Sequence, residues 1–195
     1  TIFGGSFEAA NSGRFTTTAG TGNALSAVAI NAPVDLVSNS SIDFAAPTLL
    51  NNNLITVNTT GTQATTQLNF PAPTLISGSG AILLPSGPTP TDAARLVVSG
   101  GALTLGPAQT LSGIGRTFGA FITQGTLNPG APLGTLAFVN TLSLQPTSTL
   151  ICQLGGTTPG ATYDQVTVNQ SASIAGRLRV QLQPGFTPGS HDTFT

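Results

Sequence analysis

Residues 101–154 read GALTLGPAQTLSGIGRTFGAFITQGTLNPGAPLGTLAFVNTLSLQPTSTLICQL, and this stretch decides the fold. Large apolar residues recur in it every six to ten positions, at Leu103, Leu111, Phe121, Leu127, Leu136, Leu142 and Leu150. A Gly, Pro or Asn lies between most neighbouring members of this series. The spacing predicts a coil of about three short faces, or roughly 20–25 residues per turn of a parallel β-solenoid.

The rest of the chain shows the same sequence pattern, in which short alternating apolar runs lie between turn residues. Examples are the runs at 96–98, 166–168 and 178–182, and the punctuating Gly-Gly, Pro-Gly and Asn-Pro-Gly sequences. Alternation over so few residues is typical of strands, and Gly, Pro and Asn are typical of tight turns. The sequence therefore predicts an all-β protein, a parallel β-solenoid with Gly, Pro and Asn turns, and a β-sandwich as the alternative. Residues 23–32 favour one short helix, and residues 89–94 favour a single helical turn.

Charge is scarce along the whole chain. Only 6% of the 195 residues are charged, whereas an ordinary soluble domain carries roughly 25%. The net charge is −1 and all five basic residues are arginines, which form no basic stripe that would indicate nucleic acid as a partner. No apolar run reaches the roughly 18 residues of a membrane-spanning helix. In a solenoid, side chains stack in ladders, so uncharged residues are favoured and like charges in register repel.

We expect one continuous domain in two parts. Residues 1–99 form a β-rich N-terminal part in which Phe3, Phe7 and Phe15 are interpreted as an assembly or docking segment, and residues 100–195 form the C-terminal solenoid part. Most of the ten phenylalanines are predicted to stack inside. The abrupt start and end suggest a piece of a longer exported chain.

Residues that could carry catalytic or redox chemistry are few. His191, the single histidine, lies beside Asp192, and no Gly-x-Ser-x-Gly nucleophile elbow accompanies it, so it is interpreted as a solvent-facing turn residue. Cys152 is the single cysteine and lies in an apolar run, which favours a small buried hydrophobic residue over a reactive thiol. Residues 113–116 (GIGR) fit neither a dinucleotide-binding fingerprint nor a phosphate-binding loop.

Acidic residues are also scattered. Asp35, Asp43, Asp92, Asp164 and Asp192 stand singly, which predicts no metal or cofactor site, although a calcium site formed between coils stays open. The pair Tyr163-Asp164 suggests half of a sugar site, but an aspartate that accepts backbone hydrogen bonds in a turn is the preferred interpretation. Threonine clusters at 16–18, 56–60 and 62–66 suggest ice binding, but they are irregular, and β-propensity explains them better.

One segment carries a family resemblance. Residues 125–136 (GTLNPGAPLGTL) resemble the glycine-proline step of bacterial exported β-solenoids. The runs LSL at 142–144, LICQLGG at 150–156, YDQVTV at 163–168, AGRL at 175–178 and PGF at 184–186 follow in an order similar to that of the autotransporter-associated β-strand repeat proteins and PEP-CTERM-type surface passengers. The resemblance is best over residues 100–195. It implies a secreted or cell-surface location and a structural, adhesive or biofilm-related role.

These observations together predict a non-catalytic structural protein that is extracellular or on the cell surface. Its expected partners are copies of itself, in a filament, layer or biofilm matrix, together with other surface or matrix components. Two alternatives remain. One is a monomeric passenger-type adhesin that binds through residues 83–91, and the other is a carbohydrate-active β-helix that depends on Asp164.

Overall fold

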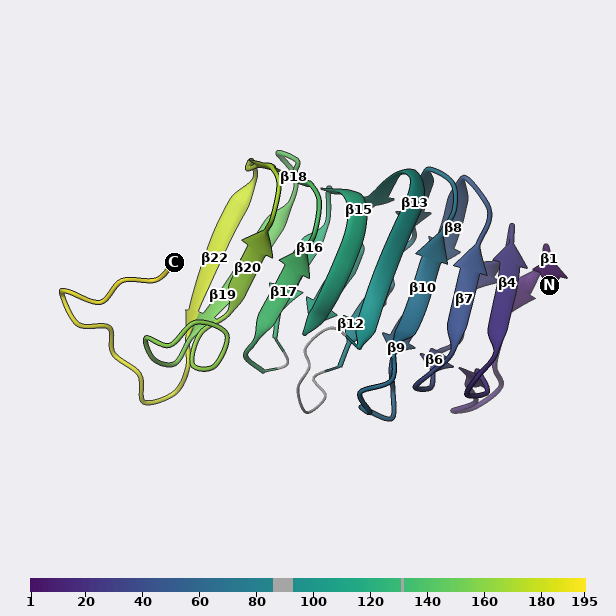
Figure 1. Cartoon of the computed structure of the whole chain (residues 1–195), viewed down its shortest axis with the longest axis horizontal. Helices are drawn as coiled ribbons and strands as arrows, with labels where there is room; N and C mark the ends of the chain where they lie inside the picture. Colours follow the sequence, from purple (N-terminus) through teal and green to yellow (C-terminus); the bar gives the residue numbers. More distant parts are fainter. Residues whose placement is uncertain (86–92, 131) are drawn as a thin grey trace.

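Parallel strands wind around a single axis in this protein. The computed structural model describes residues 1–85, 93–130 and 132–195, which form 22 β-strands and no helix. Successive coils stack from the N-terminal end to the C-terminal end (Figure 1), and every pairing between described strands is parallel. The sheets of a β-sandwich are antiparallel. The predicted parallel β-solenoid is therefore confirmed, and the sandwich alternative is not.

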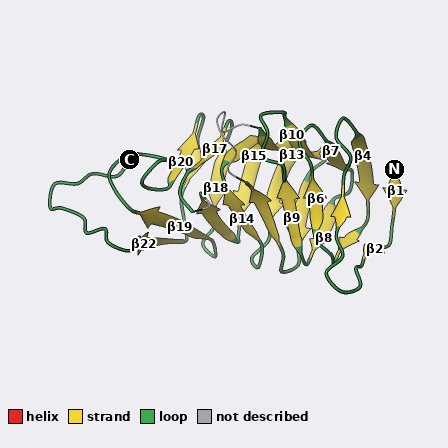
Figure 2. Ribbon diagram, turned by 90° about the horizontal axis from the view of Figure 1, so that it is seen from below, coloured by secondary structure: helices red, strands yellow, loops and turns green. Residues whose placement is uncertain are grey.

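Each coil contributes strands to three faces, which Figure 2 shows from a second direction. Face 1 contains β1 (Ile2–Phe3), β4 (Gly22–Ser26), β7 (Ser41–Phe44), β10 (Thr66–Phe70), the first parts of β13 (Ala94–Leu105) and β15 (Gly115–Thr123), β17 (Thr135–Phe138) and β20 (Gln165–Val168). Face 2 contains β2 (Ser6–Phe7), β5 (Ala29–Ile30), β8 (Thr48–Asn51), β11 (Thr74–Ser77), the second parts of β13 and β15, β18 (Leu142–Leu144) and β21 (Ala172–Ser173). Face 3 contains β3 (Phe15–Thr16), β6 (Val34–Leu36), β9 (Leu54–Val57), β12 (Ala81–Leu84), β14 (Thr110–Gly113), β16 (Thr126–Pro129), β19 (Thr149–Leu154) and β22 (Arg177–Leu182).

Strand β13 joins the two parts into which the sequence was divided at residue 99. It runs from face 1 to face 2 without a break, as does β15, so these two faces form one sheet of 14 strands beside the eight-stranded sheet of face 3. The register between β13 and β15 shifts between Val97 and Ala102, where β13 bends around the corner. Strands on both sides of residue 99 thus belong to the same sheet.

Coil length varies more than the sequence spacing predicts. Leu111 lies opposite Leu127 in the next coil, whereas Leu136 lies opposite Val166, so the second of these coils is nearly twice as long as the first. The predicted coil of roughly 20–25 residues lies between these two lengths. Loops leave the solenoid at its corners, so an insertion lengthens a coil without displacing the strands that stack.

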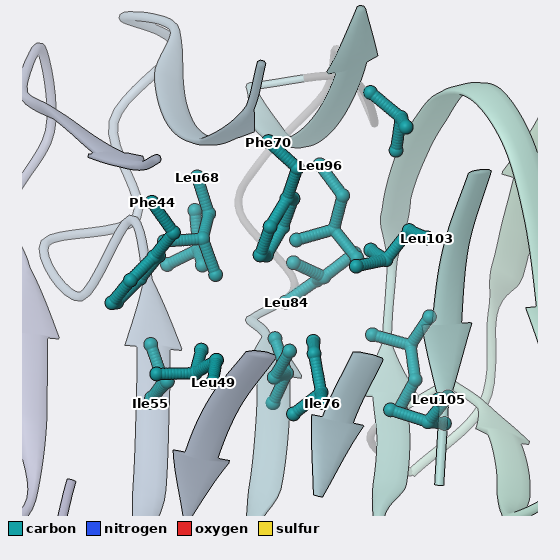
Figure 3. Packing of buried hydrophobic residues seen from close by; sticks show 14 of the residues in the cluster. Phe44, Leu49, Ile55, Leu68, Phe70, Ile76, Leu84, Leu96, Leu103 and Leu105 are labelled. Atoms are coloured by element: carbon teal, nitrogen blue, oxygen red, sulfur yellow. The ribbon is translucent and has the colours of Figure 1, made fainter. Parts of the chain in front are cut away.

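The core is a set of inward apolar ladders along the three faces. Every second residue of a strand points inward, and side chains from facing strands meet in one interior (Figure 3), where Phe44, Phe70 and Leu49 are 0–2% exposed. The rings of Phe44 and Phe70 stack with centroids 5.9 Å apart, and those of Phe121 and Phe138 lie 5.2 Å apart. These are the four buried phenylalanines. The expectation that most of the ten would be buried is wrong, because the rest lie on the end coils, the tail or the outer surface.

The helix expected over residues 23–32 is also wrong. This segment forms β4 and β5 on adjacent faces. The segment buries Leu25, Val28 and Ile30, and the spacing of these buried residues resembles that of one face of a helix. Ala27 between them has a φ of 53°, so the chain turns a corner there and the inward phase changes. Of the helical turn expected over residues 89–94, residues 89–92 lie outside the described residues, and Ala94 begins β13.

Glycine is required where one corner approaches the coil before it. Gly113 has a φ of 103°, and a Cβ placed on it would lie 1.8 Å from the carbonyl oxygen of Leu84. The backbone N–H of Ile114 donates to that same oxygen at 2.7 Å. Any side chain at Gly113 would therefore separate two coils that are hydrogen-bonded together.

Removing a ring from the ladder tests the stacking directly. We expect Phe70→Ala to lower the free energy of unfolding by about 3–5 kcal/mol, because the cavity lies in a closed interior against Phe44. The control is Leu75→Ala on β11, whose side chain is 38% exposed on the outer surface. Urea unfolding followed by circular dichroism measures both. Equal effects of the two substitutions would contradict the interior ladder.

Candidate functional site

The side chain of Asp164 links two separate backbone segments by hydrogen bonds. Its Oδ1 accepts a hydrogen bond from the N–H of Gly134 at 3.1 Å, and its Oδ2 accepts one from the N–H of Gln153 at 2.9 Å. The side chain is buried, and this burial raises the pKa of the carboxyl above its ordinary value, while the two backbone N–H groups act in the opposite direction. Both contacts match the interpretation of Asp164 as an acceptor of backbone hydrogen bonds.

Tyr163 fastens the C-terminal tail to the solenoid. Its hydroxyl accepts a hydrogen bond from the N–H of Thr195 and donates one to the carbonyl of Thr195, each at 3.1 Å. The ring meets that of Phe194 edge to face, with centroids 5.3 Å apart. Phe186 extends this aromatic group, with its centroid 6.4 Å from that of Phe194. No local sequence pattern predicts this contact, because Tyr163 and the end of the tail lie far apart in the chain.

The cysteine, the histidine and the aspartate beside it lie in surroundings that do not activate them for catalysis. Cys152 is half-buried on β19, and burial, with Asp164 nearby, raises the pKa of its thiol and so disfavours the reactive thiolate. His191 is exposed in the tail, and its Nδ1 lies 2.9 Å from the hydroxyl of Ser190. The neighbouring Asp192 accepts a hydrogen bond from the N–H of Gly189 at 2.8 Å, which closes a turn.

The acidic residues lie apart from one another. Asp35 forms an ion pair with Arg14, with Nη1 and Oδ2 2.5 Å apart, and Asp43 accepts a hydrogen bond from Asn69 at 2.6 Å. Asp92 lies outside the described residues, as does most of the 83–91 segment considered for adhesion. In the part of the chain that the structure describes, no group of three or more His, Cys, Asp or Glu side chains is placed to hold a metal ion.

Two arginines contradict the expectation that like charges avoid register. Arg95 and Arg116 lie directly opposite each other on β13 and β15 of face 1. The guanidinium carbon of Arg95 lies 5.4 Å from the centroid of the Phe118 ring, a cation–π distance.

Residues 113–116 form the corner that leads from β14 into β15. The chain continues there as a strand and not as the helix of a phosphate-binding loop.

Threonine and serine fill the corner between face 3 and face 1. The hydroxyl oxygens of Thr17 and Ser40 lie 2.6 Å apart, and Thr60 donates to Ser38 at the same distance. Ser38 in turn donates to the Oδ1 of Asn58. Thr17 and Thr60, from two of the irregular threonine clusters, therefore each bond to a serine in another coil.

A second polar contact is fully buried at the corner between face 2 and face 3. Asn51 donates to the Oε1 of Gln109 at 3.0 Å, and Gln109 donates to the carbonyls of Asn51 and Ser77 at 2.7 and 2.9 Å. Both side chains are 0% exposed. The two residues are 58 positions apart, so no local pattern could predict their pairing.

The C-terminal coil exposes the solenoid interior. Leu178 lies in register with Leu150 of the coil before it and is 62% exposed, and Val180 and Leu182 of the same strand are 52% and 54% exposed. Ile174 after β21 is 68% exposed. We call these four side chains the C-terminal apolar end. Three of them, on β22, continue the ladder of β19. The tail bound to Tyr163 leaves them exposed.

The N-terminal coil presents the other end of the same interior. Ile2, Phe7 and Phe15 come from β1, β2 and β3 and lie in register with Leu25, Ile30 and Val34. The rings of Phe7 and Phe15 lie 4.4 Å apart, while Ile2 and Phe15 are 49% and 37% exposed. A cavity of about 280 Å³ opens beside them, with Leu25 and Ile42 in its lining. We call Ile2, Phe7, Phe15 and this cavity the N-terminal apolar end.

Comparison with family models, curated protein sequences and solved structures found no match to this chain. Within the described residues, no helix has the length and apolarity needed to cross a membrane. The candidate functional surfaces are therefore defined by geometry alone. They are the two apolar ends.

Asp164→Asn tests the structural role of the buried carboxylate. The asparagine amide nitrogen cannot accept from the N–H of Gln153, so we expect a loss of about 1–3 kcal/mol in the free energy of unfolding. Because burial raises the folded-state pKa, the contribution of Asp164 is fully present below its unfolded value of about 3.8 and falls as pH rises through the raised pKa. The variant should lack this decline.

The measurement is the urea unfolding midpoint of both proteins between pH 3.5 and 7, with Asp192→Asn in the exposed turn as control. The difference between wild type and Asp164→Asn should change with pH and should exceed the effect of Asp192→Asn, whose side chain is exposed. A pH-independent difference for Asp164→Asn would contradict the assignment.

Proposed function

We propose that this protein is a non-catalytic structural protein whose copies associate through the ends of the solenoid. The observation that carries the proposal is the C-terminal apolar end, where inward side chains of the last coil are more than half exposed. Every internal coil covers such side chains with the next coil. The surface that remains has the shape and chemistry of a coil-to-coil contact.

The edge strands support association as well. β22 pairs with β19 on one side, which leaves the backbone groups of its other edge without a strand partner among the described residues. An exposed strand edge is a template for pairing with another chain. Repeat proteins generally cover their terminal repeats with a polar outer face, which keeps them soluble. Strand pairing and apolar burial would therefore act together at one interface.

Low charge favours the same outcome. With 6% charged residues and a net charge of −1, copies of this protein repel one another weakly. Association therefore meets little electrostatic opposition. This composition is consistent with a subunit of a filament, a layer or a biofilm matrix.

The proposed location is extracellular or on the cell surface. This part of the proposal rests on the resemblance of residues 125–136 and the downstream runs to exported bacterial β-solenoids. Other surface or matrix components are the further partners that such a role involves. The buried, hydrogen-bonded state of Asp164 gives no support to the carbohydrate-active alternative.

Sedimentation velocity over a concentration series tests self-association. We expect the 195-residue chain to form species larger than its 19.5 kDa monomer, in amounts that rise with concentration. Leu178→Arg should abolish them, because it places a charge on the C-terminal apolar end. Leu75→Arg is the matched control: it makes the same substitution at an exposed leucine on the outer surface of face 2. A monomer at millimolar concentration would overturn the proposal.

A further inference from the structure

We propose that face 1 binds an acidic polysaccharide along a column of outward side chains on β7, β10, β13 and β15. The column consists of Ser41, Gln67, Arg95 and Arg116, which lie in register in successive coils. Each of these strands is paired on both sides (Figure 1), so the site lies away from the two ends of the solenoid. The inference goes beyond the proposed self-association, which uses those ends.

The first half of the site is a shallow polar pocket of about 400 Å³ over the starts of β4, β7 and β10. Its lining includes Asn39, Ser41, Thr65 and Gln67. Asn39 is exposed and the other three are partly exposed, so their polar groups reach the solvent. Hydroxyl and amide groups both donate and accept hydrogen bonds. This half therefore matches the uncharged hydroxyl groups of a sugar.

The second half of the site is the arginine pair. Arg95 and Arg116 lie directly opposite each other, an arrangement in which like charges repel. A guanidinium carries about five N–H donors, whereas a carboxylate accepts about four hydrogen bonds. The pair therefore has donors for a ligand carboxylate even when one arginine also contacts an acidic group of the protein. A carboxylate bound between the two guanidiniums would reduce their repulsion.

The charges along face 1 fix which part of the ligand meets each half. Among the described strands of this face, Asp43 is the single acidic residue, and it accepts a hydrogen bond from Asn69 at 2.6 Å. It lies one outward position along β7 from Ser41, on the side of the pocket. Sugar hydroxyls are therefore favoured at the pocket and carboxylates at the arginines.

Spacing favours a polysaccharide over other polyanions. Strands in register repeat at about 4.8 Å, and an extended chain of β-1,4-linked sugars repeats at a similar distance. Successive sugar rings can therefore contact successive coils, so that one chain reaches both the pocket and the arginine pair. Nucleic acid is less suitable, because its binding needs a longer stripe of basic residues than two arginines.

Isothermal titration calorimetry with a β-1,4-linked glucuronate hexasaccharide tests the site. We expect wild type to bind it, and the double substitution Arg95→Gln/Arg116→Gln to weaken binding roughly tenfold or more, because charge-assisted hydrogen bonds are lost. The matched control is Arg177→Gln/Arg179→Gln, which removes the same charge from β22 on face 3 and should bind like wild type. Circular dichroism of each variant checks that the solenoid is retained.

Arg116→Gln alone replaces the double variant if loss of the contact between Arg95 and Phe118 unfolds the sheet, since it leaves that contact in place. Two smaller ligands separate the two halves of the site. Cellohexaose has the same backbone without carboxylates, and glucuronic acid has one carboxylate without the chain. Both should bind more weakly than the hexasaccharide.

Four results would overturn the inference. They are no binding of the hexasaccharide by wild type, equal binding of glucuronic acid, equal binding of a thymidylate hexanucleotide, and an equal loss in the Arg177→Gln/Arg179→Gln control. Equal binding of glucuronic acid would mean a site for a single anion, and equal binding of the nucleotide would mean attraction by charge alone. If wild type sediments as a monomer and still binds the hexasaccharide, the proposed self-association fails while this inference stands.

Discussion

The in-register stacking of inward side chains from coil to coil is the constraint on which the rest of this structure depends. Each inward position must suit the position above and the position below, because parallel strands lie only about 4.8 Å apart. Ile55, Ile82 and Leu111 form one such column on face 3. Short apolar strands, corner glycines and loops of variable length all follow, since only the stacked positions are fixed.

The same constraint explains where three hydrogen-bonded polar groups lie. Backbone and side-chain polar groups that enter the interior need partners, because burial without a hydrogen bond costs about 1–3 kcal/mol. Asn51 donates a hydrogen bond to Gln109, and Ser38 accepts one from Thr60. Asp164 accepts hydrogen bonds from two backbone N–H groups. These contacts all lie at corners or loops, where individual strands end. Asp164, which the sequence suggested as half of a sugar site, therefore stabilises the backbone around its loop.

The sequence is sufficient to predict the parallel architecture, because Leu103, Leu111 and Leu127 recur with turn residues between them. It does not predict the length of each coil, which depends on the loops at the corners. It misleads where a corner changes the inward phase, as at Ala27, and there strands imitate helical spacing. It is silent on contacts between coils, such as Asn51 with Gln109. It is silent also on the two ends, since exposure there depends on what covers a coil and not on the residues within it.

The ends are chemically different although they close one and the same interior. At the N-terminal end, Phe7 and Phe15 pack against each other and partly cover the ladder. At the C-terminal end, Leu178 and Val180 are more than half exposed and two arginines flank them on the outer side. A ladder of identical coils would have no preferred direction of growth beyond that of its strands. Here the aromatic side chains of one end and the aliphatic side chains of the other distinguish the two directions along the solenoid axis.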